Sequence, residues 1–179
     1  MGTGAVGTRS EHGTADDQRS LSNPARKPSF KHALQNRRCL IPANGFYEWV
    51  REGKRKIPMW IQLKTRQPFA FPGLWDCWID RDTGKPLYTF TIITTRANAL
   101  VSRIHDRMPV IYDRDMGRQW LEEATTDPLV LSLILQPVAS ERVEAYEVST
   151  LVNSPENDSP ECIRRISQNQ SRKGQLSFP

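Results

Sequence analysis

Short segments rich in β-branched and aromatic residues, separated by glycine, proline and asparagine, constrain the fold of this chain more than any other feature of its sequence. Segments of this kind predict strands over residues 38–42, 45–50, 57–63, 69–75, 88–95, 110–112 and 142–148. Asn44-Gly45 predicts a hairpin between the first two segments. The aromatic and branched run over residues 88–95 predicts a central strand.

Other stretches predict short helices. Ser29 is a suitable N-cap for a helix over residues 30–36, and Asp113 opens another helix. Two further helices are expected over residues 97–104 and 127–135. The predicted strands and helices do not alternate one by one, as they do in the βαβ units of a parallel sheet. We therefore predict an α+β fold, built on a curled, mainly antiparallel sheet or barrel with short flanking helices.

The composition suits one domain. The chain has 179 residues, and its polar excess lies at the two ends. Residues 1–27 and 167–179 hold too little apolar surface to offset the entropy of ordering, so we expect disorder there and one domain over residues 28–166. No apolar run reaches the about 20 residues of a membrane span, and no segment of signal-peptide type is present, so a cytoplasmic location is expected. The net charge of +5 favours an anionic partner.

Glu48 is the first candidate for chemistry. On a strand it shares one face with Phe46 and Val50. If that face borders a pocket, desolvation raises the pKa of the carboxyl group, as a general acid–base requires. The alternative is an ordinary strand glutamate in contact with water.

His105 is the second candidate. It lies in a polar loop directly after a predicted helix and is followed by Asp106 and Arg107, so it could act as a proton donor. The alternative is a loop histidine that caps the helix. The chain has only three histidines and no C-x-x-C spacing, so we expect no metal site and no cofactor.

Basic residues alternate with aromatic residues over much of the chain, which is the pattern of a groove for single-stranded nucleic acid. Trp49 and Arg107 are the better candidates for contact. In the alternative interpretation the aromatic residues are core and residues 51–56 are a solvated turn. Cys39 is either a small core residue or the nucleophile of a cysteine hydrolase that also uses His105.

Several motifs in one order resemble the SRAP family (SOS response-associated peptidase, the abasic-site processing proteins). They are Lys27-Pro28-Ser29-Phe30, residues 37–49, Phe71-Pro72-Gly73-Leu74-Trp75, residues 90–98, residues 105–110 and residues 152–162. The resemblance covers roughly residues 27–165.

The resemblance implies a curled β fold that binds single-stranded DNA at abasic sites. In the family, an amino-terminal cysteine forms an imine with the sugar aldehyde and then closes a thiazolidine, which leaves a covalent DNA–protein crosslink. Glu48 would be the general acid–base, and His105 would assist sugar ring opening and crosslink reversal. Arg107 would face a phosphate. Arg9 matches an arginine of a further family motif and would also contact DNA.

The start of the chain departs from the family. The sequence begins Met-Gly-Thr-Gly where the family begins Met-Cys-Gly-Arg, so we expect a truncated or degenerate copy that lacks the first strands and the nucleophile. A transient imine through the Gly2 amine, with weak strand cleavage, is then the expected chemistry of a peptidase- or lyase-like enzyme. The alternative function is a non-catalytic single-stranded DNA-binding module. We expect a monomer, associated with the nucleoid if the source is bacterial.

Overall fold

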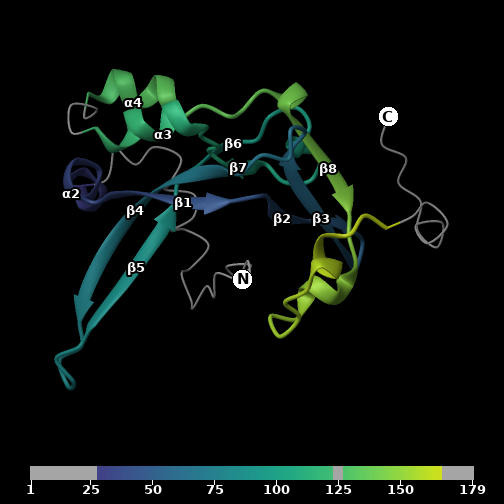
Figure 1. The fold of residues 1–179 in the computed structure, drawn as a ribbon, viewed down its shortest axis with the longest axis horizontal. Helices are drawn as coiled ribbons and strands as arrows, with labels where there is room; N and C mark the ends of the chain where they lie inside the picture. The colour runs from purple at the N-terminus through teal and green to yellow at the C-terminus, as the bar shows by residue number, and fades with distance from the viewer. Residues whose placement is uncertain (1–27, 123–126, 167–179) are drawn as a thin grey trace.

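The computed structural model describes residues 28–122 and 127–166 and confirms the predicted α+β class (Figure 1). Every strand pair between the labelled strands of the described residues is antiparallel. The helices and strands, in chain order, are α2 (Pro28–Asn36), β1 (Arg38–Ala43), β2 (Phe46–Glu52), β3 (Arg55–Leu63), β4 (Phe69–Ile79), β5 (Pro86–Ile92), β6 (Thr94–Arg96), β7 (Arg107–Pro109), α3 (Arg114–Leu121), α4 (Pro128–Ile134) and β8 (Val143–Glu147).

The strands form two three-stranded sheets, ordered β1-β4-β5 and β2-β3-β8, and a two-stranded ladder of β6 and β7. The three helices lie together beside β4, and the β4–β5 hairpin extends away from the rest of the molecule (Figure 1). Among the described residues, no helix is both long enough and apolar enough to span a bilayer. The expected disorder at both ends concerns residues outside the described ranges.

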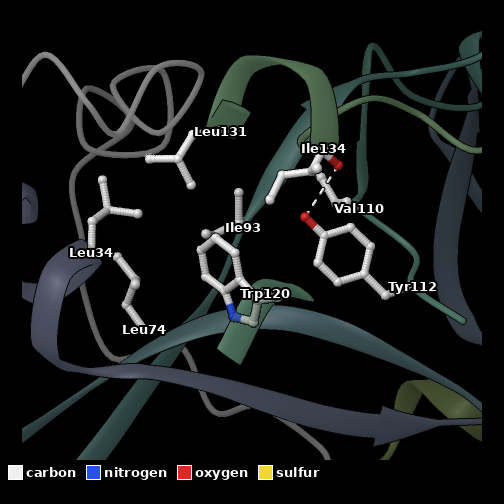
Figure 2. Close-up of a cluster of buried hydrophobic side chains, with 8 residues drawn as sticks. All are labelled: Leu34, Leu74, Ile93, Val110, Tyr112, Trp120, Leu131 and Ile134. Carbon is white, nitrogen blue, oxygen red and sulfur yellow. Dashed lines mark hydrogen bonds between the residues drawn. The ribbon is translucent and has the colours of Figure 1, made fainter. Parts of the chain in front are cut away.

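One buried cluster fixes the helices against the first sheet (Figure 2). Trp120 of α3 is fully buried, and its indole N–H donates to the main-chain oxygen of Cys39 on β1 at 2.9 Å. The hydroxyl of Tyr112 donates to the main-chain oxygen of Ile134 at 3.1 Å, which attaches α4. Burial of large side chains at about 2 kcal/mol each makes this cluster the anchor of the first sheet.

A second buried cluster joins the two large sheets to the β6–β7 ladder. It contains Ile61, Leu63, Phe69, Phe71, Val101, Met108, Val138 and Val143. Ile61 belongs to β3, whereas Val101 and Met108 lie on either side of His105 in sequence. This core therefore fixes the second sheet relative to the loop that holds the histidine.

The hairpin predicted at Asn44-Gly45 is wrong. β1 pairs with β4, and β2 pairs with β3, so the dipeptide joins two different sheets. A Cβ on Gly45 would lie 2.3 Å from the Trp60 ring and 2.7 Å from the main-chain oxygen of Ile61. Position 45 thus requires glycine because the Trp60 ring and the Ile61 oxygen leave no space for a side chain. The hairpin turn between β2 and β3 occurs instead at Gly53, whose φ of +58° suits glycine.

The predicted central strand over residues 88–95 is also wrong. It divides into β5, an exposed edge of the first sheet, and β6, which pairs with β7. Tyr88 is 68% exposed and Phe90 is 45% exposed, so their β propensity does not reflect burial. The strand expected at residues 110–112 lies earlier, at Arg107–Pro109, and only Tyr112 of the predicted segment bridges to another strand.

The remaining predicted elements are confirmed with shifted ends. The strands over residues 57–63, 69–75 and 142–148 correspond to β3, β4 and β8. Asp113 caps α3 by accepting from the main-chain N–H of Met116. The first helix begins at Pro28, a residue suited to the first turn, so Ser29 lies inside it and is not its cap. The helix expected over residues 97–104 is reduced to a single 3₁₀ turn, η3 (Val101–Arg103).

Candidate functional site

Glu48 lies in the middle of β2, on the face of the sheet that meets the core. Its cross-strand partner is Met59, which is 2% exposed, and the next pair on this face joins Phe46 to the fully buried Ile61. Directly opposite residues of an antiparallel pair point to the same face, so the carboxyl group projects along a buried surface. Glu48 itself is half-buried. The structure thus places the carboxylate at the border between core and solvent.

A buried asparagine positions His105. The side-chain oxygen of Asn98 accepts hydrogen bonds from the main-chain N–H groups of Leu100 and Val101 at 3.1 and 2.9 Å, and this caps the turn that leads into η3. Its amide donates to the main-chain oxygen of Val138 at 2.9 Å. The main-chain N–H of His105 then donates to Val101 at 2.9 Å, so the histidine leaves the turn at a fixed position. The sequence interpretation missed Asn98, although a polar residue before a helical turn is a recognisable cap signal.

The ring of His105 is fixed by the main chain of the next strand. The N–H of Arg107 donates to Nδ1 of His105 at 3.1 Å. The main-chain oxygen of Arg107 lies 3.2 Å from the same Nδ1, so Nδ1 can accept from the Arg107 N–H in one tautomer and donate to the Arg107 oxygen in the other. Asp106 Oδ1 lies 3.2 Å from the same Nδ1 and would accept its proton in the charged imidazolium. The imidazole side chain is 48% exposed, so solvent reaches the ring.

Glu48 and His105, separated by 57 positions in the chain, interact electrostatically in the structure. Desolvation raises the pKa of Glu48 above its usual value of 4.5. Attraction to His105 and a hydrogen bond from the Trp49 main chain oppose this shift, whereas the negative charge of Asp106 supports it. The net rise means that the acid holds its proton to a higher pH than an exposed glutamate does.

Arg107 is held beside this pair on β7. Its guanidinium donates to Thr94 Oγ1 from Nε at 3.0 Å and from Nη2 at 2.7 Å, and to the Thr94 main-chain oxygen at 2.6 Å. Burial lowers the pKa of Arg107, and the charge of Asp106 opposes that shift. The cation is therefore prepositioned by neutral acceptors and keeps its full positive charge available for an anion. Thr94 was missed because nothing in a β-rich run distinguishes one threonine from its neighbours.

Trp49 lies on the opposite face of β2 from Glu48 and is partly exposed. Its indole N–H donates to Asn153 Oδ1 at 2.8 Å. Asn153 ends the 3₁₀ turn η5 (Thr150–Asn153), so this bond links the loop over residues 154–159 to β2. The two faces of β2 thus present a carboxylate and an indole one residue apart.

Cys39 does not join this group. It lines a cavity of about 380 Å³ on the first sheet together with Trp75, Tyr88 and Phe90, and His105 is not among the residues that line it. Burial raises the pKa of the Cys39 thiol, which opposes formation of the nucleophilic thiolate. Arg9 lies outside the described residues. Within the described ranges, no group of three or more His, Cys, Asp or Glu side chains is placed to hold a metal ion.

The chain is similar to known proteins in both sequence and structure. The family model described as SOS response associated peptidase (SRAP) matches residues 19–155. The chain is 53% identical over 138 residues to the abasic site processing protein YoqW of Bacillus subtilis (strain 168), which covers 76% of this chain and 61% of that protein. It is 36% identical over 157 residues to the abasic site processing protein HMCES of Gallus gallus, covering 76% of this chain and 46% of that protein.

A crystal structure of a protein from Bacteroides thetaiotaomicron superimposes with a TM-score of 0.75 at 30% sequence identity, covering 86% of this chain and 71% of that chain. The chain spans about three fifths of the length of YoqW and less than half of HMCES. The matched segment of the family model contains Glu48, Trp49, His105 and Arg107.

Proposed function

Because the chain belongs to the SOS response associated peptidase (SRAP) family, we propose that it processes abasic sites in single-stranded DNA. The names of its relatives YoqW and HMCES support this proposal, since both are abasic site processing proteins. The alternative of a cysteine hydrolase loses support, because His105 is not among the residues that line the cavity beside Cys39.

The observation that carries the proposal is the electrostatic interaction of a desolvated carboxyl group with an imidazole that the main chain of Arg107 holds in place. An abasic sugar exists mainly as a closed hemiacetal. Opening it requires loss of the proton of the anomeric hydroxyl and gain of a proton by the ring oxygen. Glu48 and His105 can exchange these two protons, because one is a half-buried acid whose pKa is raised and the other an imidazole that solvent reaches. The open aldehyde then reacts with an amine to give an imine and water.

Two further side chains would hold the DNA. Arg107 is fixed by Thr94 and offers a guanidinium to a phosphate beside the abasic sugar. Trp49, whose indole orientation is set by Asn153, offers an aromatic face to an adjacent base. We propose that the site takes single-stranded DNA, because stacking on Trp49 requires an unpaired base.

Trapping the imine with borohydride on single-stranded DNA with one abasic site tests the proposal. We expect a covalent adduct on a denaturing gel. Glu48→Gln and His105→Ala should each slow its formation by about 100-fold or more while leaving DNA affinity nearly unchanged. Arg107→Ala should lower affinity and make it less dependent on salt. Adduct formation at an unaltered rate in both Glu48→Gln and His105→Ala would overturn the roles assigned here.

The same experiment distinguishes the proposed function from the alternative, a non-catalytic single-stranded DNA-binding module. Such a module would bind the oligonucleotide and lose affinity in Arg107→Ala, but it would yield no trapped adduct with any variant. The monomeric state, the cytoplasmic location and a role for Arg9 in DNA contact remain predictions from the sequence.

A further inference from the structure

The turn between β2 and β3 holds a dense group of positive charge close to the site. Residues 51–56 read Arg-Glu-Gly-Lys-Arg-Lys, four cations and one carboxylate. We call the cations Arg51, Lys54, Arg55 and Lys56 the basic turn; all four are exposed. None of them forms an ion pair with another side chain in the described part of the chain.

The register of the hairpin places two of these cations directly opposite one another. Arg51 pairs across the strands with Lys56, two positions beyond the pair of Trp49 and Pro58. Like charges at directly opposite positions of a sheet destabilise it, so the hairpin alone gains nothing from this pair. An anion that bridges Arg51 and Lys56 would remove the repulsion, which makes the pair a suitable phosphate contact.

The basic turn is rigidly aligned with the site residues. Because side chains alternate along a strand, Arg51 and Lys56 share the face of Trp49. Arg51 is two residues beyond Trp49, or about 7 Å along the strand. The adjoining part of β3, including Ile57 and Met59, is buried, and the turn itself closes at Gly53 with φ of +58°. The cations therefore continue the surface of Trp49 away from Glu48.

We propose that Arg51 and Lys56 of the basic turn bind the phosphates of the DNA strand on one side of the abasic nucleotide. This inference rests on the proposed function for the identity of the anion, and it extends the footprint of the strand beyond Trp49. The turn binds backbone phosphate and reads no base, because exposed lysine and arginine side chains on a hairpin tip offer charge without a base pocket.

The test measures affinity for intact single-stranded DNA as a function of salt, which requires no abasic site and no chemistry. For single strands, each phosphate contact contributes about 0.7 to the slope of log affinity against log salt. The double variant Arg51→Gln/Lys56→Gln should therefore lower the slope by about 1.4, which corresponds to about 25-fold weaker binding at 0.1 M salt if affinities converge at 1 M.

The β4–β5 hairpin supplies a matched control. Arg81→Gln/Lys85→Gln removes the same two charges from exposed positions at the other hairpin tip. We expect this control to change the slope by less than about 0.7. The basic-turn variant should melt at the same or a slightly higher temperature than the parent, because a like-charge pair is removed. Equal slopes for the two double variants would overturn the inference and reduce the basic turn to a solvated loop.

Single-stranded oligonucleotides that extend on only one side of an abasic site show whether the basic turn binds phosphates on the 5′ or the 3′ side of that site. The parent should gain affinity from either the 5′ or the 3′ overhang, and the basic-turn variant should lose that gain. A gain retained in the variant on both sides would also overturn the inference. Failure to trap an imine, with the slopes as expected, would instead overturn the proposed function and leave phosphate binding by the turn standing.

Discussion

Removal of the Asn98 side chain is predicted to destabilise both the fold and the site. Asn98 is only 8% exposed and makes three hydrogen bonds through its side chain, two accepted from the start of η3 and one donated to Val138. Asn98→Ala removes all three and leaves the main-chain oxygen of Val138, a residue that is 8% exposed, without this donor.

The expected cost follows from these contacts. Loss of a cap costs about 1 kcal/mol, and a buried carbonyl left unpaired costs about 1–3 kcal/mol. The free energy of unfolding should therefore fall by about 2–4 kcal/mol, which lowers the melting temperature of a chain of this size by about 4–16 °C. Asn98→Ser is the control, since a serine can still cap the turn but is too short to reach Val138, and it should cost about 1–3 kcal/mol, about 1 kcal/mol less than Asn98→Ala.

Urea unfolding followed by tryptophan fluorescence measures these differences. A loss below about 1 kcal/mol in Asn98→Ala would refute the reasoning, because it would mean that water replaces all three bonds without penalty. Imine trapping at a urea concentration well below the transition provides a second measurement. Because η3 places His105, the trapping rate of the folded Asn98→Ala variant should also fall, and Asn98→Ser should retain most of it.

Three other predictions concern single positions. Glu48→Gln should stabilise the protein at pH 7. Because the pKa of Glu48 is raised in the folded state, its stabilising contribution is complete below about pH 4.5 and is lost as the pH rises through the folded pKa. The gain in melting temperature of the variant should therefore vanish in acid. Gly45→Ala should cost about 2–3 kcal/mol in urea unfolding through its clash with Trp60, more than the about 1 kcal/mol expected for Gly53→Ala, which has open space but a positive φ. Thr94→Val should weaken single-stranded DNA binding about tenfold by freeing the Arg107 guanidinium, with Thr94→Ser as the variant that restores it.

The two candidate acid–base residues could be predicted from local patterns. Alternation along a strand placed Glu48 on the same face as Phe46 and Val50, and the structure shows that this face meets the core. His105 was predicted to follow a short helical turn, and it follows η3. Both inferences depended only on neighbours within a few residues, where backbone periodicity determines the direction of a side chain.

Pairings between distant segments could not be predicted in this way. Asn44-Gly45 has the composition of a hairpin turn, but its glycine is needed because the Trp60 ring lies against it, a contact that depends on β3. Residues 88–95 have the composition of a buried strand, but β5 has a free edge because only β4 pairs with it among the described strands. Asn153, which orients Trp49 across 104 positions of sequence, shows no local signal of that contact.

The geometry of the site is therefore a property of the tertiary core. Glu48 belongs to the sheet of β2, β3 and β8, whereas His105 and Arg107 belong to the β6–β7 ladder and the turn before it. Their relative position is held by the second buried cluster, which contains Ile61 from the sheet that carries Glu48 and Met108 from the strand that carries Arg107. Because such a core is close-packed, it fixes the strand that carries the half-buried Glu48 carboxyl group. The two groups therefore differ in environment, since desolvation raises the pKa of Glu48 whereas the imidazole of His105 is 48% exposed, and this difference supports the acid–base roles proposed for them.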